Sequence, residues 1–247
     1  MIVTSRMLFN RLYTAIIVVW VVLVTLVLGI VVILVALFSR NGNVPHLIAR
    51  AWARSILMVA GIPVQVEGIE NLNIDGSYIL MPNHQSNFDI PVLLGCLPVQ
   101  FRWLAKAELF KIPIFGRGMR GCGYISIDRS NRKSAFRSLA EAAQKIRDGV
   151  SVLIFPEGTR SWDGEIQPFK KGGFVLSVDA GVPIIPIIIS GTRAVMPKGK
   201  LMIRRLPVRM QILTPIATSN YTRKTKDELM GVVRTTISNA YRDKVDD

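Results

Sequence analysis

The sequence is poor in cysteine and histidine. Of its 247 residues only two are cysteine, Cys96 and Cys122, and only two are histidine, His46 and His84. Two cysteines that lack the paired spacing of metal ligands argue against both a disulfide framework and a zinc site. Any imidazole chemistry must use His46 or His84. The sequence also lacks internal repeats and low-complexity segments, which excludes a solenoid and a disordered polymer.

Acidic residues are scarce as well. Asp and Glu number 17 against 31 Lys and Arg, so the net charge is +14. This imbalance predicts an anionic partner, which is a nucleic acid, a membrane surface or a phosphorylated substrate. Half of the residues are hydrophobic and the mean hydropathy is +0.36, which is high for a soluble protein. The length suits one mid-sized domain plus an appendage.

A long uncharged run near the N-terminus predicts a membrane anchor. Residues 12–39 are 28 consecutive residues without a charge. As a helix they span about 42 Å, more than the hydrocarbon core of about 30 Å. A secretory signal has an apolar region of only about 7–15 residues, so we interpret this run as a retained anchor. The alternative is a helix buried in the protein core.

A second helix is expected at residues 45–60, after a break at residues 41–43. Arg50 and Arg54 share one stripe of it and apolar side chains lie opposite, so this helix is expected in the membrane interface with its arginines at headgroup level. The flanking charges fit either one spanning helix or a helix pair within one leaflet. We favour the one-leaflet pair. We therefore divide the chain into a membrane-anchoring segment, 1–62, and a catalytic domain, 63–247.

The remaining pattern predicts an α/β fold. Seven short apolar runs are typical of strands, at residues 64–67, 78–81, 101–104, 124–127, 152–155, 184–189 and 208–213. Helices fit between them at residues 90–95, 132–147, 172–180 and 224–242. Such alternation indicates a mostly parallel or mixed central sheet covered by helices. Functional sites of these sheets form where strands end at their carboxyl edge.

The first such strand end carries a His and an Asp five residues apart, His84 and Asp89. Across a strand-to-helix turn the carboxylate can hold Nδ1–H and leave Nε2 as a general base. Equally, His84 could be a turn residue and Asp89 a helix N-cap. The sequence has no Gly-x-Ser-x-Gly string, so a hydrolase nucleophile is not supported. A base without a protein nucleophile would activate a substrate hydroxyl directly.

A second polar string, residues 155–161, follows the strand at 152–155. Gly158 allows close backbone approach to a ligand, Thr159 offers a hydroxyl and Arg160 can clamp a phosphate. Glu157 either accepts from a substrate hydroxyl or orients Arg160 as an ion pair.

Two further cations follow strands, Lys106 and Arg129, and each is either a ligand of an anion or a surface residue. Residues 116–121 match G-x-G-x-x-G, but they lead into a strand and lack the context of a dinucleotide site. We expect a flexible basic loop there, with anion contact as an option.

Together these strings resemble the glycerolipid acyltransferase family, specifically the 1-acyl-sn-glycerol-3-phosphate acyltransferases. His84 and Asp89 match the family's His-x4-Asp motif. Residues 123–129, 155–160 and 182–186 match its second, third and fourth blocks, in the expected order. The resemblance covers about residues 80–187.

The resemblance implies an enzyme of phospholipid biosynthesis. His84, oriented by Asp89, would deprotonate the sn-2 hydroxyl of lysophosphatidate. That oxygen would attack the thioester of acyl-CoA or acyl carrier protein and give phosphatidate. The implied substrate-binding residues are Lys106, Arg129, Glu157, Gly158, Thr159 and Arg160. No metal and no cofactor beyond the acyl donor is implied.

The expected partners are the lipid bilayer, lysophosphatidate and the donor, but no nucleic acid. The expected location is the cytoplasmic membrane, with the catalytic domain facing the cytoplasm. Two alternatives stay open. One is an acyltransferase that acts on a different lysolipid or an acylated amino acid, and the other is a non-catalytic binder of anionic lipid or nucleic acid.

Overall fold

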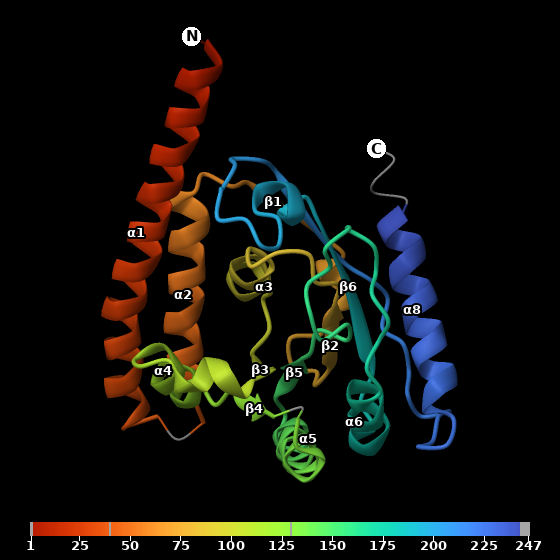
Figure 1. Cartoon of the computed structure of the whole chain (residues 1–247). Helices are drawn as coiled ribbons and strands as arrows, with labels where there is room; N and C mark the ends of the chain where they lie inside the picture. Colours follow the sequence, from red (N-terminus) through yellow and green to blue (C-terminus); the bar gives the residue numbers. More distant parts are fainter. Residues whose placement is uncertain (1, 40, 129, 243–247) are drawn as a thin grey trace.

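The computed structural model describes residues 2–39, 41–128 and 130–242. A pair of long helices stands beside an α/β domain, and the N-terminal end of α1 extends beyond the rest of the molecule (Figure 1). The first helix, α1 (Ile2–Ala36), begins before the apolar run and ends three residues short of its predicted end. The second helix, α2 (Asn43–Val59), follows the predicted break. The helix pair expected from the sequence is therefore present.

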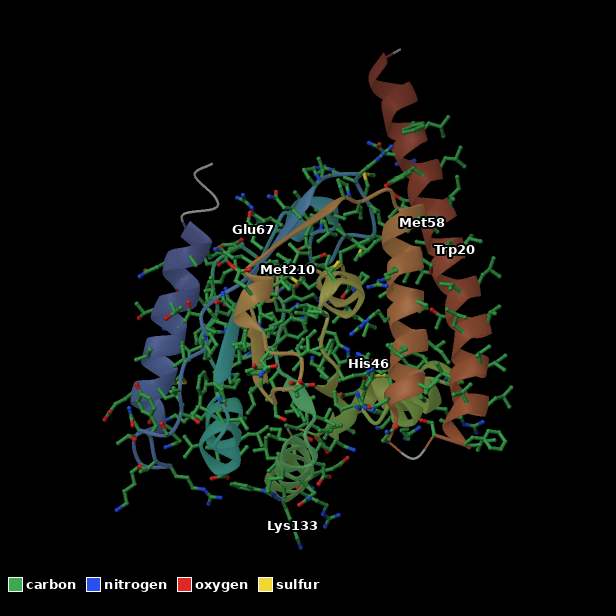
Figure 2. The ribbon with its side chains drawn as sticks, turned by 180° about the vertical axis from the view of Figure 1, so that it is seen from behind. Trp20, His46, Met58, Glu67, Lys133 and Met210 are labelled. Atoms are coloured by element: carbon green, nitrogen blue, oxygen red, sulfur yellow. The ribbon has the colours of Figure 1, made fainter. Side chains whose placement is uncertain are left out.

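Part of the helix α1, Leu8–Ala36, is long and apolar enough to cross a membrane. Only 17% of its most apolar window is buried, which argues against a helix of the protein core. Apolar side chains stand out along its outer side with no other element beyond them (Figure 2). Its inner side packs on α2, where Trp52 Nε1 donates to Thr25 Oγ1 at 2.9 Å.

The arginine stripe of α2 differs from the prediction, because it faces the α/β domain rather than lipid headgroups. Arg50 Nη2 donates to Val99 O at 2.9 Å and Arg54 Nε donates to Gly95 O at 2.8 Å. Both acceptors lie at or just after the C-terminus of α3 (Asp89–Cys96). The last carbonyls of a helix have no partner within it and carry partial negative charge, so cations satisfy them.

The α/β domain contains a seven-stranded mixed sheet in the order β1-β7-β6-β2-β5-β3-β4. The strands are β1 (Val64–Glu67), β2 (Ile79–Pro82), β3 (Phe101–Lys106), β4 (Ile125–Ile127), β5 (Ser151–Leu153), β6 (Ile184–Ser190) and β7 (Val208–Ile212). Among the strands of the described residues, only β6 and β7 are antiparallel neighbours. All other neighbours are parallel. The predicted fold class and all seven strands are confirmed, with ends that move by one or two residues.

Helices cover both faces of the sheet because successive strand residues point to opposite sides. Leu80 packs in one core cluster with α1, α2 and α3. Its neighbours Ile79 and Met81 pack in the other, with α5 (Arg132–Arg147), α6 (Gly172–Ala180) and α8 (Lys226–Arg242). Short elements complete the fold: η1 (Ile69–Asn71), η2 (Ala107–Lys111), α4 (Phe115–Gly121) and α7 (Thr192–Val195).

Residues 116–121, expected as a flexible basic loop, are instead part of the helix α4. This helix packs against α1 through its glycines. A Cβ added at Gly121 would lie 2.9 Å from the Cβ of Ala36, so the two helices approach too closely for a larger residue. The G-x-G-x-x-G string therefore serves helix packing.

Candidate active site

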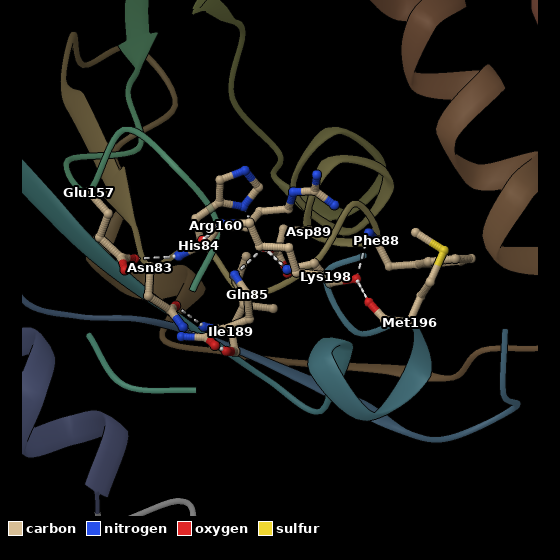
Figure 3. A network of polar contacts seen from close by, with 11 residues as sticks. Asn83, His84, Gln85, Phe88, Asp89, Glu157, Arg160, Ile189, Met196 and Lys198 are labelled. Carbon is tan, nitrogen blue, oxygen red and sulfur yellow. Dashed lines mark hydrogen bonds and ion pairs between the residues drawn. The ribbon is translucent and has the colours of Figure 1, made fainter. Parts of the chain in front are cut away.

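The loop between β2 and α3 brings His84 and Asp89 together. His84 Nδ1 lies 2.7 Å from Asp89 Oδ2 (Figure 3). The same oxygen accepts the backbone N–H groups of Gln85 at 2.7 Å and Ser86 at 2.9 Å. Asp89 is the first residue of α3, and the N-cap position belongs to Phe88. The carboxylate therefore holds the loop and the imidazole rather than capping the helix.

This geometry fixes the role of each imidazole nitrogen. Asp89 is fully buried, while 14% of the His84 side chain is exposed. With Nδ1 bonded to a carboxylate, the neutral ring carries its proton there and leaves Nε2 as the basic nitrogen. The ring stacks on Phe155 with centroids 3.7 Å apart and an interplanar angle of 12°. Packing and hydrogen bonding thus hold the ring in one orientation.

The loop after β5 clamps the His84 backbone from two sides. Glu157 Oε1 accepts the N–H of His84 at 2.7 Å, and its other oxygen accepts the N–H of Gln167 at 2.8 Å. Ser161 N–H donates to His84 O at 2.9 Å. Only 1% of Glu157 is exposed, and this burial raises its pKa to about 7. Both carboxylate oxygens are thus engaged with backbone amides, and neither contacts Arg160 in an ion pair within the described residues.

Four of the other predicted site residues line one cavity, while Glu157 lies behind it against the His84 backbone. The cavity has a volume of about 910 Å³, and its lining includes His84, Lys106, Gly158, Thr159 and Arg160. Lys106 is the last residue of β3 and is exposed. Gly158 has a φ of +73°, which a side chain would disfavour. Arg129 lies outside the described residues.

Most of the cavity wall is apolar. It runs between α1, α2, α3 and α4, and its lining includes Val21, Trp52, Leu94 and Met119. The imidazole of His84 lies in the same lining, together with the side chains of Thr159 and Arg160 from the second polar string and of Lys106 from β3. Such a cavity suits an amphiphile with a long apolar part and an anionic head. The described residues contain no group of three or more His, Cys, Asp or Glu side chains that could hold a metal ion.

Sequence reasoning gave no role to Asn83, which the structure places at the base of the site. Its amide oxygen accepts the N–H of Ile189 at 2.7 Å and its amide nitrogen donates to Ile189 O at 3.0 Å (Figure 3). Pro82 pairs with Ile187, so this side chain continues the β2–β6 pairing by one step beyond the strand. Asn83 is fully buried and thereby fixes where the His84 loop leaves the sheet. The signal available in the sequence was the amide side chain of Asn83, which directly precedes the candidate catalytic histidine.

Lys198 was missed because it lies far along the chain, after α7. Its ammonium donates to Arg160 O at 2.6 Å and lies 3.4 Å from Thr159 Oγ1. It therefore fixes the backbone that carries Arg160. No local pattern distinguishes this lysine from other surface lysines.

Comparison with known proteins gives a consistent result. A family model described as "Acyltransferase" matches residues 63–190. A 1-acyl-sn-glycerol-3-phosphate acyltransferase from Brassica napus chloroplasts is 38% identical over 67% of this chain and 48% of its own length. The human alpha enzyme of the same name is 32% identical over 83% of this chain and 73% of its own length. The first of these relatives are longer proteins, and the chain spans about half to two thirds of their length.

A solved structure is similar over almost the whole chain. The 1-acyl-sn-glycerophosphate acyltransferase PlsC from Thermotoga maritima superposes with a TM-score of 0.81 and 28% sequence identity. The match covers 96% of this chain and 98% of that one, so it includes the helix pair as well as the sheet.

Proposed function

The chain belongs to the 1-acyl-sn-glycerol-3-phosphate acyltransferase family, and we propose that it acylates the sn-2 hydroxyl of lysophosphatidate to form phosphatidate. The donor is an acyl thioester, either acyl-CoA or acyl carrier protein. The observation that carries this proposal is the 2.7 Å contact between His84 Nδ1 and Asp89 Oδ2 on the wall of a largely apolar cavity. The Ser nucleophile of a hydrolase is not needed.

The reaction uses His84 first as a base and then as an acid. Its Nε2 takes the proton of the substrate hydroxyl while that oxygen attacks the thioester carbonyl carbon. The carbon–sulfur bond breaks, the ester bond forms, and the departing sulfur takes the proton from Nε2. The products are phosphatidate and the free thiol. Asp89 keeps the proton on Nδ1 and stabilises the transient imidazolium.

Cations at the cavity hold the substrate phosphate. Arg160 supplies a planar pair of N–H donors and Lys106 supplies a second charge. Gly158 and Thr159 lie beside them in the cavity lining and complete the subsite. Arg129 is a further candidate for the same phosphate. Glu157 acts differently, because both of its oxygens hold backbone amides, and we assign it the positioning of the His84 loop.

The helix pair supports membrane association, and we propose the cytoplasmic membrane with the catalytic domain on its cytoplasmic side. Lysophosphatidate resides in the bilayer, so a site next to α1 meets it without extraction into water. Residues 1–62 form the anchoring segment and residues 63–247 the catalytic domain. The chain's net charge of +14 attracts anionic lipid as well as an anionic donor.

The test is a direct assay of the detergent-purified full chain. It is incubated with lysophosphatidate and a labelled acyl thioester, and the product is identified by mass spectrometry. We expect phosphatidate and an equal amount of free thiol. A panel of other lysolipids and acylated amino acids runs in parallel, and preferential acylation of one of these would contradict the assigned acceptor.

A further inference from the structure

Trp162 is a large aromatic side chain that the proposed acyl transfer does not use, although it lies next to the residues that do. It is 68% exposed and follows Arg160 by two positions. Between them, Ser161 N–H donates to His84 O at 2.9 Å. Because consecutive Cα atoms are only about 3.8 Å apart, the Trp162 backbone lies close to the base. The indole itself is linked to the cavity by Lys198, whose ammonium contacts both the ring and Thr159 in the cavity lining.

The indole is held on one side by the segment after α7. The ammonium of Lys198 lies 4.4 Å from its ring centroid, within the range of a cation–π interaction. A Cβ added at Gly199 would lie 2.9 Å from the ring, so the ring rests directly against this backbone. Arg193 Nη2 donates to Trp162 O at 3.3 Å. The result is a fixed aromatic surface with much of its area in water.

The charges around the indole are mainly positive. Lys198 lies over its ring, Arg193 donates to its backbone oxygen and Arg160 precedes it by two positions. Within the described part of the chain none of the three forms an ion pair. Two carboxylates are near in sequence, Asp163 and Glu165. Asp163 Oδ1 is engaged, because it accepts from Ser161 Oγ at 2.7 Å and from Glu165 N at 3.0 Å. Three cations against two carboxylates leave the surface attractive to an anion.

We propose that Trp162, Lys198 and Arg193 bind the adenine nucleotide of a CoA thioester. The adenine stacks on the exposed face of the indole, and the two cations contact the phosphates of the nucleotide. Proteins commonly bind nucleotides in this way, with an aromatic side chain against the base and basic side chains at the phosphates. The proposal rests on the proposed acyl transfer and names its donor as CoA. A pantetheine arm then runs from the nucleotide toward His84 in the adjoining cavity.

An exposed Trp beside Lys is also typical of a membrane interface. The surroundings favour the nucleotide. Asp163 and Glu165 follow Trp162 closely in the chain and disfavour its insertion into an anionic bilayer, whereas the extended apolar surface of this chain lies on α1. Membrane contact by Trp162 is the competing outcome that the second experiment below detects.

The first experiment measures nucleotide binding without any acyl transfer. The full chain in detergent is titrated calorimetrically with 3′-phosphoadenosine 5′-diphosphate, the nucleotide half of CoA. We expect Trp162→Ala to raise the Kd about tenfold or more, the usual scale for one lost base stack. Trp162→Phe should restore most of the affinity. Lys133→Ala, an exposed residue of α5 at the lower end of the molecule in Figure 2, is the surface control and should leave the Kd unchanged. An equal Kd for Trp162→Ala and the wild type would overturn the proposal.

The second experiment compares two donors. With acyl-CoA, Trp162→Ala should raise the donor KM about tenfold and leave kcat and the lysophosphatidate KM unchanged. With an acyl-pantetheine thioester, which lacks the nucleotide, the variant and the wild type should be equal. An equal loss of activity with both donors would contradict the proposal. Reduced sedimentation of the Trp162→Ala variant with anionic vesicles would assign Trp162 to membrane contact and would also contradict it. If the wild type binds the nucleotide but acylates nothing, the proposed function fails and this site stands.

Discussion

Glu157 is the residue at which the two catalytic loops meet, and its ionisation links them to pH. Burial raises its pKa to about 7 from an ordinary value of 4.5, while two backbone amides partly oppose the shift. A carboxyl with a raised pKa in the folded state keeps its proton after the unfolded chain has lost it. Stability is therefore greatest below the unfolded pKa and is lost as the pH rises from about 4.5 to about 7.

We expect Glu157→Gln to remove this pH dependence. Between pH 5 and pH 8 the wild type should lose on the order of 1–3 kcal/mol of unfolding free energy that the variant does not lose. The variant also lacks one acceptor for the two amides, so its stability at pH 5 should be lower. Urea unfolding followed by tryptophan fluorescence at both pH values measures the difference. Parallel losses in both proteins would refute the titration of this carboxyl.

Arg160 is the residue expected to recognise the phosphate of the acceptor. We predict that Arg160→Ala raises the KM for lysophosphatidate about tenfold or more, since a charge-assisted bidentate contact is lost. Arg160→Lys should recover only part of the affinity because a point charge replaces the planar fork. Arg137→Ala, an exposed arginine on α5, serves as the charge-matched control. An unchanged lysophosphatidate KM in Arg160→Ala would rule out the clamp.

At the scale of elements, the contact between α1 and α4 depends on Gly121. We expect Gly121→Ala to cost about 1–3 kcal/mol, because its new Cβ would lie 2.9 Å from the Cβ of Ala36. Adding Ala36→Gly removes the opposing methyl group and should recover much of the loss. Gly231→Ala in α8, where nothing lies within 4 Å, is the control and should be neutral or stabilising. The readout is the urea midpoint of each variant, and independent effects of the two substitutions would contradict the contact.

The elements differ in how far the sequence predicts them. The strands were predicted well because short apolar runs between helices leave few alternatives, and β2 moves by only one residue at each end. The helix α4 was missed because its glycines are typical of loops, and their role appears only when α1 lies against them. The predicted position of Arg50 and Arg54 at the lipid headgroups is wrong. Sequence periodicity identifies a polar stripe on a helix, but it does not identify the element that the stripe contacts, which is the C-terminal end of α3.

The candidate site shows the same division. The pairing of His84 with Asp89 is local, so a spacing of five residues across one turn was enough to predict it. The contacts of Asn83 with Ile189 and of Lys198 with Arg160 join segments 106 and 38 residues apart. Strand order and loop docking decide such contacts, and neither is visible in a linear pattern.

At the scale of the whole molecule, the helix pair sets how the protein meets the bilayer. The one-leaflet arrangement predicts that the two outer ends of the helix pair, the start of α1 and the end of α2, face the same side of the membrane. Cysteines introduced singly at Leu8 and Met58, which are 69% and 73% exposed, should then react with an impermeant maleimide from the same side of sealed vesicles. Labelling from opposite sides would establish a spanning helix instead.

The native cysteines permit this labelling experiment. Cys122 is buried, and burial raises its pKa to about 12, so its thiolate is scarce. Burial also raises the pKa of the Cys96 thiol. The unmodified chain provides the background label to be subtracted.

The proposed reaction depends on His84 as the base, and the only other histidine of the sequence cannot replace it. His46 is fully buried, and its pKa is lowered to about 3 by burial and by nearby Arg102. It stays neutral at physiological pH and stacks edge-on against Phe101. His46→Gln should therefore lower stability and leave the turnover of the folded protein unchanged.

The most direct measurement is the turnover of His84→Ala at saturating lysophosphatidate and acyl thioester. We predict a fall in kcat of roughly 10²–10⁴ or more, the range for a positioned general base, with an unfolding midpoint close to that of the wild type. The fold should survive because the neighbouring loop holds the backbone of this residue rather than its ring. A kcat within a few fold of the wild type would contradict the assignment.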